Sequence, residues 1–191
     1  KLTDATGAAG DEFGYSVSIS GNYAIVGSWN DDVGANSNQG SATIYQYNGT
    51  NWLLMQKITD ATGAALDRFG FSVSVSGNRV IIGAPYDDDG ANINEGSVSI
   101  FQYNNSLSSW VLMGKLTHVS GTPQNLFGYS VAISGEKAII GSPNVDNTAV
   151  PVNQAGRATI YHFNSTTWVL AYDIPLSNGV NDHLGQSVSI Y

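Results

Sequence analysis

The chain repeats one phrase at a nearly constant interval, and this repetition restricts the possible folds more than any single residue does. Residues 11–29 read DEFGYSVSISGNYAIVGSW, and residues 67–85 read DRFGFSVSVSGNRVIIGAP. Aligned copies of the aromatic-glycine or leucine-glycine pair follow at intervals of 56, 58 and 57 residues. These copies begin at Phe13, Phe69, Phe127 and Leu184. A tryptophan recurs with the same period, at Trp52, Trp110 and Trp168. Two independent markers with one period predict a tandem-repeat architecture.

Each repeat has the pattern of four short strands separated by turns. In residues 13–21, Tyr15, Val17 and Ile19 alternate with serines, as in a strand with one apolar and one small polar face. We expect the serine face to leave room for the bulky face of an adjacent unit. A Ser-Gly-Asn turn suits a tight hairpin, and the next strand is apolar on both faces and must be covered on both sides. No segment shows sustained helical periodicity, so we predict an all-β chain.

Four antiparallel strands in about 57 residues predict a β-propeller whose four-stranded blades stack face to face. A continuous sandwich is the alternative, but it gives no reason for a phrase to recur at a fixed period. We predict three full blades plus one strand of a fourth. The predicted blades span 13–56, 69–114 and 127–172, with a partial blade at 184–191. Three blades and a strand cannot close a ring, because propellers close with about four to eight blades.

The order Asp/Asn-x-Phe-Gly, Ser-Val-x-Ile/Val-Ser-Gly and Gly-Ala-Pro resembles the FG-GAP repeat of integrin α-chain heads and many bacterial surface proteins. The fullest copy combines Phe69-Gly70 with Gly83-Ala84-Pro85. The resemblance implies an arc of a seven-bladed propeller, completed by further blades of the same chain or by a homo-oligomer. Integrin-type repeats often carry a calcium cage between the first two strands. Here that position is only Ser-Gly-Asn or Ser-Gly-Glu, so the chain is more similar to the short, calcium-poor repeats of bacterial exported proteins.

Composition excludes several classes of function. The formal net charge is −8, with seven basic and 15 acidic side chains, which argues against a nucleic-acid partner. The absence of cysteine removes disulfides, thiol chemistry and cysteine-based zinc sites. No apolar run has the length of a membrane span. The chain opens on Lys1 without a signal-like segment, and the simplest interpretation is a processed or excised piece of a longer protein.

No catalytic constellation is recognisable in the sequence. The three histidines occupy unlike positions in the repeats, and no nucleophile motif or phosphate-binding glycine loop accompanies them. We therefore predict that the protein is not an enzyme.

The segment between the second and third strands of the second repeat, YDDDGANINEG, holds the candidate metal ligands. Clustered carboxylate and amide oxygens are what Ca²⁺ prefers. The candidate calcium ligands are Asp87, Asp88, Asp89, Asn92, Asn94 and Glu95. Turn chemistry is the alternative, because Asp and Asn also hydrogen-bond their own backbone. The third repeat retains only Asp146 of these carboxylates, which favours turns.

Aromatic residues beside these loops predict a ligand site. Trp29 stands where the other repeats have Pro85 and Pro143, and Tyr86 follows one position later in the next repeat. Exposed aromatic rings beside carboxylates hold sugars in many lectins, so the candidate ligand-binding residues are Trp29, Asp31, Asp32 and Tyr86. The alternative is that each ring packs on its own loop.

Two further patterns recur at equivalent places. An Asx side chain precedes each Phe-Gly or Leu-Gly pair by two residues, and we expect it to cap the loop that enters the first strand. These residues are Asp11, Asp67, Asn125 and Asp182. The turns between strands three and four each contain an N-glycosylation pattern, at Asn48, Asn104 and Asn164. Short asparagine turns also arise without glycans.

The sequence thus favours a non-catalytic, secreted or cell-surface module that recognises or adheres to an extracellular glycan or protein through its inter-strand loops. The alternative is a structural repeat that self-assembles into a surface layer, fibre or appendage. An enzyme would need an Asp/Glu pair converging at the central channel, which the sequence does not place.

Overall fold

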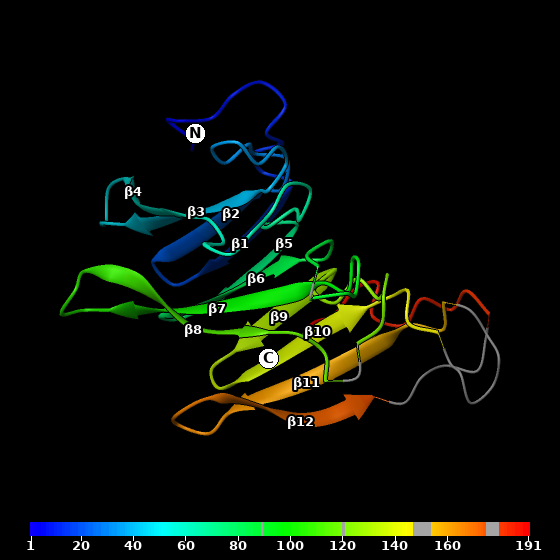
Figure 1. Ribbon diagram of the computed structural model, residues 1–191. Coiled ribbons are helices and arrows are strands. Elements are labelled where there is room, and N and C mark those ends of the chain that lie inside the picture. The colour runs from blue at the N-terminus through cyan, green and yellow to red at the C-terminus, as the bar shows by residue number, and fades with distance from the viewer. Residues whose placement is uncertain (89, 120, 147–153, 175–179) are drawn as a thin grey trace.

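A computed structural model describes residues 1–88, 90–119, 121–146, 154–174 and 180–191. In these residues the strands form three four-stranded antiparallel sheets stacked in chain order, one for each repeat (Figure 1). The first sheet contains β1 (Ser16–Ser20), β2 (Tyr23–Ser28), β3 (Ser41–Tyr47) and β4 (Trp52–Ile58). The second contains β5 (Ser72–Ser76), β6 (Arg79–Ala84), β7 (Ser97–Asn104) and β8 (Ser109–Leu116). The third contains β9 (Ser130–Ser134), β10 (Lys137–Ser142), β11 (Arg157–Phe163) and β12 (Trp168–Ile174). The predicted all-β blade architecture is confirmed.

Each blade begins with the tight hairpin that the Ser-Gly-Asn or Ser-Gly-Glu turn predicts. In the first blade Ser20 pairs with Tyr23, which leaves Gly21 and Asn22 as a two-residue loop. Gly21 has φ of 55°, and the glycines at the equivalent positions of the other blades have nearly the same value. A glycine with positive φ at the first loop position matches the right-handed twist of the paired strands. No described helix is long and apolar enough to cross a membrane.

The inner strands β1, β5 and β9 stack on one another through their serines. The Ser16 hydroxyl donates to the Gly70 carbonyl at 2.7 Å, and the Ser18 hydroxyl accepts from the Val75 amide at 3.1 Å. The next interface repeats the first of these bonds from Ser72 and the second from Ser74. The sequence predicts that the serines leave room for the next blade. Their hydroxyls also satisfy its backbone, which the small size of the side chain alone does not predict.

Glycines allow neighbouring blades to approach closely where the first strand of a blade begins and its second strand ends. A Cβ on Gly83 would lie 2.1 Å from the Gly128 carbonyl oxygen, a distance that no side chain tolerates. Gly128 itself has φ of 90° and donates its amide to the Gly141 carbonyl of its own blade. The glycine of one repeat's Gly-Ala-Pro position therefore packs against the Phe-Gly glycine of the next repeat.

Two apolar cores fill the spaces between neighbouring blades. Phe69 belongs to the core between the first and second blades, Phe127 to the core between the second and third, and both are fully buried. Trp110 packs edge-on against Tyr23 of the preceding blade, with ring centroids 5.3 Å apart. The prediction that the Phe-Gly phenylalanines form inter-blade core is confirmed at these two positions.

The two ends of the stack differ from its middle. Val17 and Ile19 of β1 are 67% and 66% exposed, whereas their equivalents in β5, Val73 and Val75, are only 8% and 6% exposed. At the other end, the predicted partial blade 184–191 retains a parallel bridge from Leu184 to Gly156. Residues 186–191 belong to no named strand.

Candidate functional site

The loops between the second and third strands, which hold most of the predicted site residues, are joints between blades. The amide of Phe69 donates to the Gln39 carbonyl at 2.7 Å, and that of Phe127 donates to the Glu95 carbonyl at 2.8 Å. Gly40 forms a parallel bridge with Phe69. Each loop therefore lies against the segment that enters the next blade, and the candidate residues lie at equivalent joints of successive blades.

The first aspartate of each acidic loop is an ion-pair partner of a lysine on the fourth strand. Lys115 Nζ lies 2.5 Å from Asp87 and 2.8 Å from Asp60. In the first blade, Lys57 makes the equivalent contacts to Asp31 at 2.6 Å and to Asp4 at 2.8 Å. Burial alone would lower the pKa of Lys115, but its hydrogen bonds to Asp60 and Asp87 raise it above the ordinary value. An ammonium group thus already occupies the place where a cation would sit between these carboxylates.

The second aspartate of each loop stabilises the loop itself. The Asp88 carboxylate accepts a hydrogen bond from the backbone amide of Asn94 at 2.7 Å, and Asp32 and Asp146 accept equivalent bonds in the other blades. Asn92 donates its side-chain amide to the buried carboxylate of Glu95 at 2.8 Å. These contacts are the turn chemistry that the sequence offers as the alternative to calcium.

The calcium site stays a prediction. Asp89 lies outside the described residues. Within the described ranges, no group of three or more acidic, histidine or cysteine side chains is arranged to hold a metal ion.

The third blade replaces the lysine and its two acids by a different set. His118 stands at the position of Asp60, and Asp173 at that of Lys115. His118 Nε2 lies 3.3 Å from Asp173 and 2.9 Å from the Arg157 guanidinium. Burial and the charge of Arg157 lower the pKa of His118, so the ring is neutral near pH 7. The cation that faces Asp173 is therefore Arg157, whose guanidinium nitrogen lies 3.7 Å from the carboxylate.

The predicted caps before the Phe-Gly pairs are confirmed in the first two blades. Asp11 and Asp67 each accept a hydrogen bond from the backbone amide three residues earlier. Asn125 accepts one from the Thr122 hydroxyl at 2.9 Å. Burial raises the pKa of Asp67 to about 6, with further contributions from the carboxylates of Asp87 and Asp60.

Trp29 and Tyr86, the two aromatic candidates, both contact one arginine. The Arg68 guanidinium carbon lies 4.7 Å from the centre of the Trp29 ring and 4.1 Å from that of the Tyr86 ring. Such distances are typical of cation–π interactions. The two loops therefore meet at a side chain that the sequence did not single out.

Further aromatic rings, each directly before the first strand of its blade, extend this contact from one blade to the next. Phe71 packs between Tyr15 and Tyr129, with ring centroids 5.1 and 4.9 Å apart, and also contacts Trp29 and Tyr86. We call the set the aromatic–arginine cluster. Its members are Tyr15, Trp29, Arg68, Phe71, Tyr86 and Tyr129. None of the six is fully buried, so solvent reaches the cluster.

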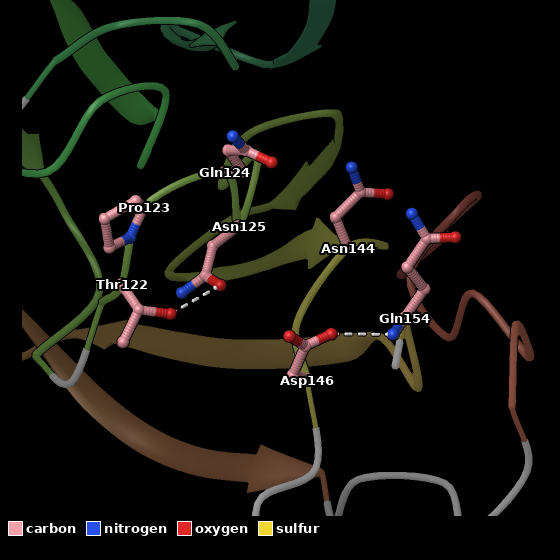
Figure 2. A pocket seen from close by; sticks show the side chains of 7 residues that line it. All are labelled: Thr122, Pro123, Gln124, Asn125, Asn144, Asp146 and Gln154. Atoms are coloured by element: carbon pink, nitrogen blue, oxygen red, sulfur yellow. Dashed lines mark hydrogen bonds between the residues drawn. The ribbon is translucent and has the colours of Figure 1, made fainter. Parts of the chain in front are cut away.

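A polar pocket of about 200 Å³ lies at the same end of the third blade (Figure 2). Amide, hydroxyl and carboxylate side chains dominate its lining. The lining residues are Thr122, Pro123, Gln124, Asn125, Asn144, Asp146 and Gln154. Asn144 stands where the second blade has Tyr86, and Gln124 where it has Leu66. Replacement of two bulky residues by amides leaves a hydrogen-bonding recess there.

The repeat model that matches the chain decides its family. It is described as the FG-GAP repeat and matches residues 1–45, 52–101 and 110–161. The chain belongs to the FG-GAP repeat family. A comparison with curated protein sequences gives no match.

Among solved structures, this FG-GAP chain is similar to Sqt1 of Saccharomyces cerevisiae, a WD40-type propeller protein. The TM-score is 0.53 at 9% sequence identity, and the match covers 88% of this chain. The chain spans only 38% of the length of Sqt1. At this identity the likeness supports the propeller fold alone.

The glycosylation patterns lie on exposed turns, as expected of FG-GAP hairpin tips. The side-chain oxygen of Asn48 accepts bonds from the amides of Thr50 and Asn51, and Asn104 and Asn164 repeat this arrangement. The asparagines therefore have a structural role in the turn, and their glycosylation stays a prediction.

Arg68 is the site residue that pattern reasoning missed. Its position, directly before the Phe-Gly pair, is occupied in the other FG-GAP repeats by Glu12, Leu126 and His183. The available signal was the departure from the repeat. Arg68 and Trp29 both stand at positions where the copies disagree, and the structure places them in contact.

Proposed function

We propose that this FG-GAP propeller segment is a non-catalytic, extracellular recognition or adhesion module. In this proposal the loops between the second and third strands of the blades bind a glycan or a protein. The frame beneath them is rigid, because serine hydrogen bonds, glycine contacts and lysine ion pairs fix each blade on the next. Loops on a rigid scaffold commonly carry binding residues.

The observation that carries the proposal is the aromatic–arginine cluster. Rings from all three blades and one guanidinium gather where solvent reaches them, although the apolar cores lie elsewhere. Aromatic and arginine side chains are the residues that most often dominate binding energy at interfaces. Two loop segments far apart in sequence, at Trp29 and Tyr86, contribute to one surface.

The test is a glycan array combined with a pull-down from cell-surface and matrix extract. We expect specific binding that falls at least tenfold when Trp29 and Tyr86 are both replaced by alanine. The matched control replaces Tyr47 and Trp52, an exposed-turn aromatic pair with centroids 5.3 Å apart at the opposite end of the first blade. Blank results in both assays, or equal losses in the two variants, would contradict the proposal.

A second candidate function, self-assembly, is supported by the uncovered face of β1. Val17 and Ile19 are exposed there, while the same positions in β5 and β9 are buried under the preceding blade. The occupant that fits is another inner strand with a serine face, from a second copy of this chain. Sedimentation velocity over a hundredfold concentration range tests this, with Val17 and Ile19 replaced by serine.

Self-assembly predicts association that this double variant abolishes. The matched control, Leu53→Ser with Leu54→Ser, removes two similarly exposed apolar side chains from β4 and should not affect it. A monomer at all concentrations, or association that persists in the β1 variant, excludes this second candidate.

A further inference from the structure

Arg68 is a cation without an anionic partner in a strongly acidic chain. Its guanidinium makes no hydrogen bond and no ion pair with any described residue; its contacts are the rings of Trp29 and Tyr86. By contrast, Lys57 and Lys115 are each held between two carboxylates. A guanidinium carries five N–H donors in a planar fork, and here that fork lies without acceptors beside solvent-accessible rings.

The Trp29 and Tyr86 rings cover the inner part of the Arg68 side chain. The Nε atom of Arg68 is buried without a hydrogen-bond partner, and so is the indole Nε1 of Trp29. The terminal nitrogens of Arg68 are not among the buried atoms, so solvent reaches the outer edge of the fork. Two aromatic faces thus orient a guanidinium whose free edge suits a bidentate oxygen anion.

We propose that Arg68 anchors a carboxylate-bearing saccharide on the aromatic–arginine cluster. This inference rests on the proposed recognition function and names its ligand class. The fork binds one carboxylate through two parallel N–H···O bonds. The neighbouring rings of Tyr15, Phe71 and Tyr129 offer apolar faces to the adjoining sugar rings.

The charge of the whole chain selects among anionic ligands. A net charge of −8 repels densely charged polyanions, so nucleic acids and heavily sulfated chains are disfavoured. A saccharide with isolated carboxylates needs only one cationic contact, which Arg68 supplies. An acidic peptide would satisfy the fork as well, but it makes less use of a run of adjacent rings, and it is an outcome of the test.

The experiment is an array of uronic-acid and sialic-acid oligosaccharides, each paired with its methyl ester, together with acidic hexapeptides. We expect binding to free acids and at least tenfold weaker binding to the esters, since charge-assisted hydrogen bonds to a carboxylate are lost. Arg68→Gln should weaken binding to the acids by roughly tenfold to a hundredfold, and Arg68→Lys should fall between the two.

The matched control is Arg79→Gln. Arg79 also lies on an aromatic ring, with its guanidinium carbon 4.8 Å from the centre of the Phe163 ring. Unlike Arg68, it donates a hydrogen bond to the Gly135 carbonyl and is remote from the cluster in the fold. We expect this variant to bind like the unaltered protein. Thermal unfolding of each variant identifies any loss that is due to misfolding, and Arg68→Lys retains the charge if Arg68→Gln does not fold.

The outcomes distinguish failure of the carboxylate-saccharide inference from failure of the recognition function. Binding to neutral glycans or to peptides that Arg68→Gln leaves unchanged overturns this inference while the recognition function stands. Equal binding to acids and esters also overturns it. No binding to any saccharide, peptide or extract overturns both.

Discussion

Replacement of Asp67 by asparagine should stabilise the protein at neutral pH and leave its stability nearly unchanged at pH 4. Asparagine retains an oxygen that can accept from the Ala64 amide, as Asp67 does now. The third repeat already has Asn125 at this position, so the fold accommodates the amide. What the substitution removes is a buried negative charge beside Asp87 and Asp60.

The size of the effect follows from the pKa of Asp67. Burial and the two neighbouring carboxylates raise that pKa from 3.8 to about 6, which corresponds to about 3 kcal/mol of destabilisation when the carboxyl is ionised. Hydration of the site screens part of this, so we expect about 1–2 kcal/mol. Between pH 3.8 and 6 the unfolded carboxyl loses its proton before the folded one does, so stability decreases as pH rises through this window. Above pH 6 the full penalty is present, and the asparagine variant escapes it.

Urea unfolding at pH 4.0, 5.0, 6.0 and 7.5 measures this difference. The control is Asp88→Asn, an exposed carboxylate that accepts one backbone hydrogen bond, as asparagine also can. Its effect should stay within about 0.5 kcal/mol at every pH. If Asp67→Asn destabilises the protein at pH 7.5, or if its effect does not change between pH 4 and pH 7.5, the electrostatic reasoning at this joint is refuted.

Three further outcomes are expected. Lys115→Met should cost about 3 kcal/mol at pH 7 by urea unfolding, because it leaves Asp60 and Asp87 buried without their cation; a loss below about 1 kcal/mol would mean that the pair is hydrated. Ala132→Ser should add about 0.5–1 kcal/mol, because it supplies a hydroxyl at the position where Ser18 and Ser74 accept a bond from the next blade, and the repeat aligns Ile190 with the donors Val75 and Ile133; no gain would indicate that the Ile190 amide does not lie within reach. Millimolar calcium should leave the unfolding temperature unchanged, since an ammonium already lies between the carboxylates, whereas a rise of several degrees would establish a metal site.

The sequence predicted the frame well because the frame is repeated. A period shared by the Phe-Gly pairs and the tryptophans, together with alternation in residues such as Val73 and Val75, specified blades, hairpins and inter-blade core without any structural information. Local rules also predicted the caps, since Asp11 and Asp67 bond amides only three residues away. Repetition supplies several independent observations of each local preference.

The contacts that the sequence did not predict join distant residues or arise where the repeats differ. Asp87 looked like a calcium ligand because its partner, Lys115, follows 28 residues later on another strand and gives no local signal. The serines of the inner strands looked like small spacers, although Ser74 accepts a bond from Ile133 in the next blade. Arg68 stands at a variable position, and only the structure shows that two loops bring Trp29 and Tyr86 to it.

The central claim is that ligand binds at the aromatic–arginine cluster, and the indole signals of the four tryptophans test it most directly. A ¹H–¹⁵N spectrum of the protein, titrated with an oligosaccharide identified on the array, should show the indole signal of Trp29 shifting as the ligand binds. The signals of Trp52, Trp110 and Trp168, which lie in the first two residues of the fourth strands and away from the cluster, should remain in place. A shift of those three signals without a shift of Trp29, or binding that moves none of the four, would contradict the account.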